Sequence, residues 1–398
     1  MSSRPNALPL RTWLYLLAQS INLTAAVMSV SMAALVGATL APASWAATIP
    51  YGCQFLLLML CTIPASRLMA RWGRQKAFLL SCLPLALAGI SGYAAVQGQN
   101  FWLLMLAHAL LGTYIAFANF NRFAATDGLD AVLRPRAISL VVAGGLIAAF
   151  SGPLLSRQLQ HVAGMGEFAG AYLVFVALAA VALLINLLIG HTPPGDTRQT
   201  ARIRPATGPL LRTVLQDPVT RLAVLVSALG FGLMNLLMIQ TSIQLSVGLC
   251  SGFDDISQAI QWHVLAMFAP SLIAGRLIPW LGAKRLSLLG VLLVAGSAAI
   301  NLIAVDYDTI VTALILLGLG WNFTYVGGSA LFTERSASMP HAVELQGVND
   351  LAISILATLG AFSPALLHAT IGWNGTNVLA IALCLLLAWQ GWRLRRAG

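Results

Sequence analysis

Residues 66–76 read SRLMARWGRQK, and residues 275–285 read GRLIPWLGAKR. Both stretches are basic, and each one separates two long apolar segments. Gly73 of the first stretch corresponds to Gly282 of the second with an offset of 209 residues. A repeated loop at this distance indicates that the chain consists of two similar halves.

Apolar segments of membrane-spanning length surround these loops on both sides. Of 398 residues, 59% are hydrophobic and only 9% are charged, whereas soluble domains carry roughly 25% charged residues. This composition excludes an ordinary soluble enzyme or a nucleic-acid-binding domain despite the net charge of +10. The five cysteines have no CxxC spacing, which argues against a disulfide framework or a zinc ribbon. The predicted spans are 12–37, 45–69, 76–97, 101–125, 135–156, 168–190, 220–247, 257–280, 285–305, 308–332, 343–368 and 372–392.

The fold class that follows is an all-α membrane protein with twelve transmembrane helices in two six-helix repeat bundles. The predicted domains are an N-terminal bundle (1–190), a cytoplasmic linker rich in Pro, Gly and Arg (191–219) and a C-terminal bundle (220–398). A second pair of similar stretches, AAFSGPLL at 148–155 and GAFSPALL at 360–367, supports the repeat. Parallel repeats of this kind are typical of transporters with a central binding site.

The basic residues predict the orientation of the chain. If both termini are cytoplasmic, 21 of the 22 lysines and arginines lie in inner loops or tails, and only Arg157 lies outside. There is no HExxH, GxSxG, Walker A or Gly-rich dinucleotide motif, so neither an enzyme nor an ATP-driven pump is expected.

The loop between the second and third spans resembles the signature of the major facilitator superfamily, G-x-L-A-D-R-x-G-R-R/K. Leu68, Arg71, Gly73 and Arg74 match this pattern, while Ser66 and Ala70 depart from it. The resemblance implies the fold of that superfamily over the whole chain. It leaves the substrate open, because function depends on the site and not on the fold.

Methionines form the most distinctive pattern in the apolar spans. Met234 and Met238 lie four residues apart on the seventh span, as do His263 and Met267 on the eighth, so each pair shares one helix face. With offsets of 206 to 208, counterparts occur in the first half, namely Met28, Met32 and Met59. Thioethers with an imidazole form a soft-ligand set that suits Cu(I). The competing interpretation is that these methionines are apolar filling.

The pair MxxxM followed by HxxxM also resembles the CcoA-like (CalT) copper importers of bacterial inner membranes. That resemblance implies a secondary-active, alternating-access importer of copper in the inner (plasma) membrane, with Met234, Met238, His263 and Met267 handling the ion. Copper is then the transported substrate, with no permanent cofactor. Membrane lipid, the small substrate and copper chaperones are the expected partners, and nucleic acid is not.

Riboflavin transporters of the RfnT type have similar scaffolds and provide the other interpretation. In that case the chain transports an organic solute such as riboflavin or a drug, and the methionines line a cavity. Trp321 and Asn322 on the tenth span are then candidates to contact an aromatic solute.

Polar residues on the eleventh span are candidates for gating or proton coupling. Gln346, Asn349 and Asp350 share one helix face, and a carboxylate within a span is costly unless it is paired. Arg122, near the inner end of the fourth span, is the predicted partner of Asp350. Asp127 and Asp130 are predicted to pair with Arg71 and Arg74 in the loops, and His108 is interpreted as a packing residue.

Overall fold

The computed structural model describes residues 8–42, 46, 49–190, 207–251 and 253–394. All regular structure in these ranges is helical. Eleven helices are long and apolar enough to cross a membrane, and a bent pair, Gln258–Phe268 with Ser271–Leu281, raises the number to as many as twelve. The predicted all-helical membrane fold is confirmed.

The helices belong to two compact units, residues 1–128 with 144–203 and residues 129–143 with 204–398. Residues 129–143 precede the predicted linker but belong to the second unit, because the short helix α6 (Arg134–Val142) packs there. Its neighbours there are α12 (Ser271–Leu281) and α14 (Tyr307–Ser336). The backbone N–H of Gly275 donates to Ser139 Oγ at 2.8 Å. Gly275 allows this approach because it has no side chain between the two helices.

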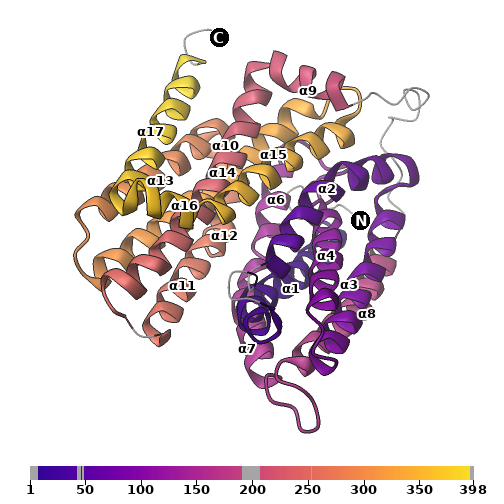
Figure 1. The fold of residues 1–398 in the computed structure, drawn as a ribbon. Coiled ribbons are helices and arrows are strands. Elements are labelled where there is room, and N and C mark those ends of the chain that lie inside the picture. Colours follow the sequence, from indigo (N-terminus) through magenta and orange to yellow (C-terminus); the bar gives the residue numbers. More distant parts are fainter. Residues whose placement is uncertain (1–7, 43–45, 47–48, 191–206, 252, 395–398) are drawn as a thin grey trace. The chain divides into compact units, whose positions relative to one another are not determined.

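The first unit is a helical bundle with a large cluster of buried apolar side chains and several buried polar residues. Within it, α3 packs against α4 and α8, α2 packs against α4, and α1 packs against α7. The indigo-to-magenta helices of Figure 1 show this arrangement. Helices suit a lipid environment because most of their backbone groups are hydrogen-bonded within the helix. Its helices are α1 (Leu10–Leu40), α2 (Ile49–Trp72), α3 (Arg74–Gln97), α4 (Phe101–Ala118), α5 (Asn121–Ala124), α7 (Gly145–Gln158) and α8 (Ala169–Ile189).

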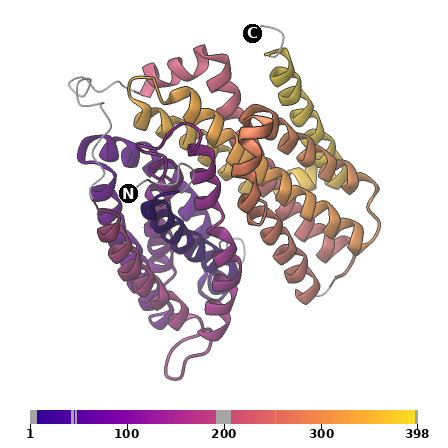
Figure 2. The same ribbon diagram turned by 180° about the vertical axis from the view of Figure 1, so that it is seen from behind.

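In the second unit, α14 is the central helix. It packs against α10, α11 and α13, and Figure 2 shows α13 and α14 side by side in orange. Besides α6, α12 and α14, the unit contains α9 (Thr207–Gln216), α10 (Pro218–Ile243), the π-helix η3 (Gln244–Gly248), α11 (Phe253–Phe268), α13 (Ala283–Ile303), α15 (Ala342–Phe362), α16 (Pro364–Thr370) and α17 (Gly372–Arg393). The bend between α11 and α12 falls at Pro270, which has no backbone N–H to continue the helix.

The internal repeat is visible in the backbone of the two units. Gly73 and Gly282, which correspond in sequence, both precede a helix with positive φ angles of 84° and 85°. Glycine has no Cβ and adopts this region without strain. The helices α4 and α14 start with similar caps, since Asn100 accepts from the N–H of Leu103 and Asp306 from that of Thr309. These caps set the offset between α4 and α14 at 206 residues.

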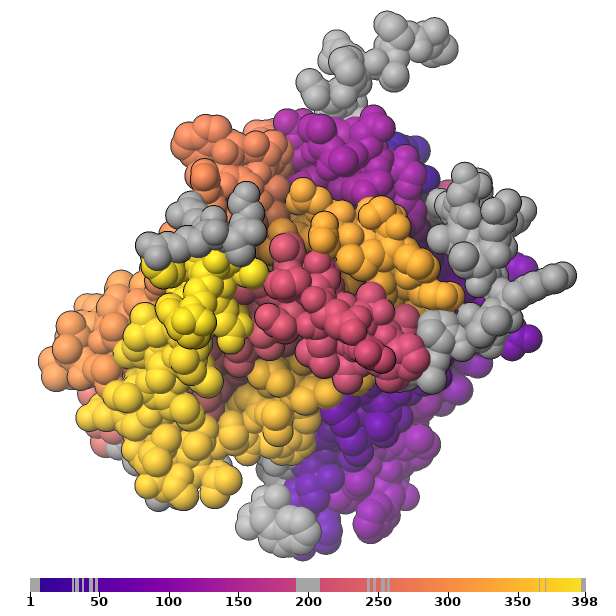
Figure 3. Space-filling model, turned by 90° about the horizontal axis from the view of Figure 1, so that it is seen from above, coloured from indigo at the N-terminus to yellow at the C-terminus, as the bar shows by residue number. Residues whose placement is uncertain are grey.

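The predicted linker has a helical second part. Residues 191–206 lie outside the described part of the chain, and α9 follows from Thr207. Leu210 and Val214, four residues apart, are buried, because α9 lies against α10 and α15. Figure 3 shows α9 in rose at the surface of the second unit, beside the yellow-orange α15.

Ion pairs connect helix ends within each unit. Arg74 binds the carboxylate of Asp127, with its Nη2 3.1 Å from Oδ1, which confirms the predicted loop pairing for these two residues. In the second unit, Arg335 Nη2 lies 2.8 Å from Asp217 Oδ1, and Asp217 also caps α10. Hydrogen bonding from Arg335 lowers the pKa of Asp217 to about 2, so this carboxylate stays charged at physiological pH.

Candidate functional site

An aromatic cluster lies in the second unit, where α10, α11 and α14 meet. Trp321 and Tyr325, one turn apart on α14, are stacked with ring centroids 5.0 Å apart and an interplanar angle of 12°. Phe231 of α10 meets the Trp321 ring edge-on at 5.6 Å, and Phe268 of α11 does so at 5.5 Å. We call these four residues the aromatic cluster. Phe231 is the partly exposed member, while the other three are buried.

Trp321 retains an unused hydrogen-bond donor in this cluster. Its side chain is 3% exposed, and among the described residues its Nε1 has no hydrogen-bond partner. A buried indole N–H usually has a partner, so this donor is available to a polar atom of a ligand. Trp321 was predicted from the sequence, whereas Phe231, Phe268 and Tyr325 were not. The spacing of Trp321 and Tyr325 at i, i+4 was the available signal.

Asn322 has a structural role in the described contacts. Its Nδ2 donates to the carbonyl of Met267 at 2.6 Å and to the hydroxyl of Ser271. These acceptors lie on either side of the bend between α11 and α12, so Asn322 fastens α14 to the bend. The Oδ1 atom of Asn322 has no hydrogen-bond partner among the described residues. A contact between this atom and a solute stays a prediction.

The seven predicted ligand residues are distributed over both units. Met28, Met32 and Met59 belong to the first unit, and Met234, Met238, His263 and Met267 to the second. In the second unit, α10 and α11 both pack against α14, and the described residues of α10 and α11 make little contact with each other. That the two pairs handle one ion together stays a prediction.

His263 is the most constrained member of this set. It is fully buried, and its Nδ1 lies 2.8 Å from the carbonyl oxygen of Leu314 on α14. A carbonyl only accepts, so Nδ1 carries the proton and the neutral ring has an unprotonated Nε2. That nitrogen has no hydrogen-bond partner among the described residues. The described residues contain no group of three His, Cys, Asp or Glu side chains that could hold a metal, so copper would depend on the methionines.

His108 is the buried histidine of the first unit and has a different set of contacts. Its Nε2 lies 2.9 Å from the hydroxyl of Tyr172, and its Nδ1 lies 3.2 Å from Ser29 Oγ and 3.3 Å from Gln54 Oε1. All four residues are buried, and both ring nitrogens have partners. His108 is thus a hydrogen-bonded core residue that joins four helices.

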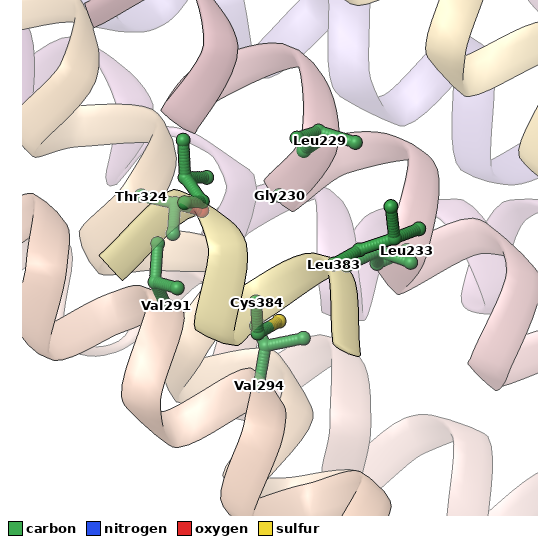
Figure 4. A pocket seen from close by; sticks show the side chains of 9 residues that line it. Leu229, Gly230, Leu233, Val291, Val294, Thr324, Leu383 and Cys384 are labelled. Carbon is green, nitrogen blue, oxygen red and sulfur yellow. The ribbon is translucent and has the colours of Figure 1, made fainter. Parts of the chain in front are cut away.

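A small crevice in the second unit does not fit a solute. It lies between α10, α13, α14 and α17, with Leu229, Leu233, Val294 and Cys384 among its lining residues (Figure 4). Its volume of about 10 Å³ is close to the least that holds one water molecule. This crevice is a packing defect between apolar side chains.

The comparison with known proteins identifies the family. Residues 12–343 match the profile of the Major Facilitator Superfamily. The chain belongs to the major facilitator superfamily.

Relatives within the superfamily include one with a named substrate. The chain is 33% identical over 372 residues to the riboflavin transporter RfnT of Brucella anthropi, covering 93% of this chain and 92% of the relative. It is 26% identical over 329 residues to the uncharacterized MFS-type transporter YdeG of Bacillus subtilis, covering 80% of this chain and 75% of that protein.

Solved superfamily structures share the fold. A bacterial homologue of the iron transporter ferroportin, in its outward-facing state, superimposes with a TM-score of 0.74 at 13% identity, covering 97% of this chain and 99% of that chain. The transporter FucP in its outward conformation gives a TM-score of 0.75 at 13% identity, covering 96% and 98%. These likenesses concern the fold alone.

The four gating candidates are buried. Arg122 belongs to the first unit, and the other three belong to the second. Gln346, Asn349 and Asp350 are at most 5% exposed on α15, and Asn349 Nδ2 donates to Asp350 Oδ1 at 3.0 Å. Arg122 is 2% exposed, and its Nη1 donates to the carbonyl of Asn119 at 2.7 Å. Because Arg122 and Asp350 belong to different units, their pairing stays a prediction.

Replacing Asp350 by asparagine is expected to lower transport about ten-fold, if the carboxylate pairs with Arg122 when the inner gate closes. The double variant Asp350→Arg with Arg122→Asp should then recover part of the loss in a proteoliposome uptake assay. A double variant no more active than either single charge reversal, at equal expression, would contradict the pairing. Proton coupling at Asp350 instead predicts that Asp350→Asn loses only the dependence on a pH gradient.

Proposed function

We propose that the chain is a secondary-active transporter of riboflavin or a closely related planar aromatic solute. The aromatic cluster carries this proposal, because four rings with one unpartnered indole N–H suit a flat heteroaromatic ring system. The RfnT relative, which extends over nearly the whole chain, supports it. The predicted copper substrate has no comparable support from the relatives.

The cluster would hold the ring system of the solute by stacking and by one hydrogen bond. A flavin ring presents apolar faces to aromatic side chains, and its carbonyl and ring-nitrogen atoms accept hydrogen bonds. Trp321 Nε1 would donate to one of these acceptors, and the partly exposed Phe231 is the natural point of first contact. The methionines on α10 and α11, which neighbour Phe231 and Phe268 in sequence, would provide adaptable apolar lining.

Transport would proceed by alternating access in the inner membrane, with both termini cytoplasmic. The distribution of 21 of 22 basic residues supports this orientation. No resident cofactor is proposed, and the solute and membrane lipid are the proposed partners.

Uptake by the purified protein in proteoliposomes tests the function. Labelled riboflavin is expected to enter protein-containing vesicles, to be displaced by unlabelled riboflavin, and to stay outside empty vesicles. Copper supplied under reducing conditions is the parallel substrate. Copper uptake without riboflavin uptake would contradict the proposal and favour copper import.

Copper import is retained as a second candidate because of one observation on His263. Its ring is oriented by the Leu314 carbonyl, which leaves a buried, unprotonated Nε2, and Met267 follows one turn later on α11. Hydrogen bonding through the second ring nitrogen is how metal-ligating histidines are usually positioned. In this case copper chaperones would be the partners.

Single Met234→Leu and Met267→Leu variants separate the two candidates. Leucine is similar in volume and apolarity, so as cavity lining each change should cost less than about 1.5 kcal/mol and leave riboflavin uptake within about two-fold of wild type. As loss of a ligand, each change should abolish most copper uptake. Met165→Leu, an exposed position between α7 and α8, is the matched control for both assays.

A further inference from the structure

Two neighbouring helices of the second unit carry arginines at the same end. α13 packs against α17, and Figure 1 shows the two side by side. A Cβ at Gly391 of α17 would lie 2.6 Å from Leu288 Cδ2 of α13, so the last turn of α17 lies beside the first turns of α13. Arg285 belongs to the first turn of α13, and Arg393 is the last residue of α17. This is the end of both helices that is predicted to be cytoplasmic.

Each arginine lies at the end of a row of exposed apolar side chains. On α13, the exposed Leu289 and Leu292 follow Arg285 by four and seven residues. On α17, the exposed Trp389 precedes Arg393 by four residues. Side chains at these spacings share one helix face. Exposed apolar rows of a membrane-spanning unit face acyl chains, so the two arginines lie at the depth where lipid headgroups begin.

Aromatic rings flank the arginine of α17. The guanidinium carbon of Arg393 lies 3.7 Å from the centroid of the Trp389 ring, which is a cation–π contact. Trp392 is also exposed, and tryptophan is enriched where a membrane meets water. We call Arg285, Trp389, Trp392 and Arg393 the interfacial patch.

The positive charge of the interfacial patch is not balanced by the protein. Residues 271–303 and 372–398, which include α13 and α17, contain no Asp or Glu. Within the described part of the chain, neither Arg285 nor Arg393 forms an ion pair, whereas Arg335 of α14 is paired with Asp217. A guanidinium group matches the geometry of a phosphate, to which it donates two parallel hydrogen bonds. The patch therefore offers two positive charges to a phosphate at headgroup depth.

The first unit has the equivalent helix pair without this combination. There α3 packs against α8, as α13 does against α17. Lys76 corresponds to Arg285 with the offset of 209 and also precedes exposed leucines on its helix. The last turn of α8, however, has no basic residue and exposes Leu187 and Leu188. The internal repeat thus supplies a position with one cation but no second cation and no tryptophan beside it.

We propose that the interfacial patch binds the headgroup of an anionic phospholipid. The acyl chains lie along the exposed rows of α13 and α17, and Arg285 and Arg393 bind the phosphate from two helices. A zwitterionic lipid carries its own ammonium group beside the phosphate, so it gains less from two arginines. This inference goes beyond the proposed function, because it assigns a class of lipid to a site that the solute does not use.

Native mass spectrometry of the purified full-length protein in detergent tests the site. The probes are phosphatidylglycerol and phosphatidylethanolamine with identical acyl chains, and affinity is measured from the fraction of protein that retains one lipid. The wild-type protein is expected to bind phosphatidylglycerol about ten-fold more tightly or better. Each arginine contributes about five-fold to binding of an anionic lipid, so Arg285→Gln combined with Arg393→Gln should remove most of this preference.

Two single variants are the controls for this change. Lys76→Gln removes one positive charge at the equivalent position of the first unit, and the preference should stay within about two-fold of wild type. Trp389→Leu keeps both arginines but removes the ring in contact with Arg393. The preference should then fall by about two- to five-fold, the contribution of an exposed cation–π contact.

Three results would overturn the site. One is equal affinity of the wild-type protein for the two lipids, and another is a double variant that keeps the wild-type preference. The third is a loss in Lys76→Gln as large as in the double variant, because any basic residue would then serve. Inorganic phosphate, compared with chloride at equal ionic strength, should not displace phosphatidylglycerol. Displacement would identify a site for free phosphate and contradict lipid binding.

Discussion

Replacing Trp321 by leucine is expected to reduce riboflavin affinity and uptake about ten- to a hundred-fold. Stacking of a heteroaromatic base on an aromatic side chain contributes about 1–3 kcal/mol, and each 1.4 kcal/mol is a factor of ten in affinity. The variant also loses the indole N–H. Among the described residues this group has no hydrogen-bond partner, so its removal leaves no protein acceptor unpaired.

Trp280→Leu is the matched control for this change. Trp280 lies in the same unit and is 79% exposed, so its replacement should leave flavin binding and uptake unchanged. Equal riboflavin affinity in Trp321→Leu and wild type, with both proteins folded by size-exclusion chromatography, would remove the aromatic cluster from the substrate site. The proposed function would then depend on sequence similarity alone.

Replacing Gly318 by alanine is expected to destabilise the protein by about 2–3 kcal/mol, in the range measured for overpacked interiors. A Cβ at Gly318 would lie 2.6 Å from the carbonyl oxygen of His263 and 2.9 Å from the backbone nitrogen of Met267. Both contacts are with the backbone of α11, so no side-chain rotation can relieve them. Small residues are the usual means by which membrane helices approach this closely.

Thermal unfolding in detergent measures this effect, with Gly296→Ala as the control. At Gly296, an added Cβ would meet the flexible Leu316 Cδ2 at 3.3 Å and no backbone atom of another described helix within 4 Å. Alanine at that position should be neutral or slightly stabilising, because glycine is a poor helix former. Gly112, the repeat counterpart of Gly318, approaches the carbonyl of Gln54 in the same way, so Gly112→Ala should also be destabilising. If Gly318→Ala and Gly112→Ala both unfold at the wild-type temperature, the close helix approach at these glycines is contradicted.

The fold could be predicted from the sequence because a membrane leaves few choices for an apolar chain. Long apolar runs must be helical in lipid, and the repeated loops around Gly73 and Gly282 mark the two halves. The positions of helix breaks could not be predicted in the same way. The bend at Pro270 has the proline as its signal, but residues 101–124 contain no proline, so the break after Ala118 has no such signal in the sequence.

The candidate site was less predictable, because it depends on which side chains meet. Hydrogen-bond partners separated widely in sequence, such as Asn322 with Met267 or Asn22 with Asn119, leave no periodic signal. Burial also does not distinguish a metal ligand from a packing residue. Met28 and Met32 are fully buried, which is expected of a methionine in either role. The carboxamides at Gln19 and Asn22 are visible as polar residues in an apolar span, but the sequence does not show what they contact.

The place of α6 in the second unit has a consequence for how the chain is made. A ribosome releases residues 134–142 well before it completes α12 and α14, the helices against which α6 packs. Ala137, Ile138 and Val141 of α6 are fully buried in the complete protein. During synthesis this face of α6 therefore stays unpacked until α12 and α14 have been made. The fifth span therefore cannot reach its final packing until residues up to about 336 have been inserted. Biogenesis of the first half thus ends only when most of the second half has been synthesised.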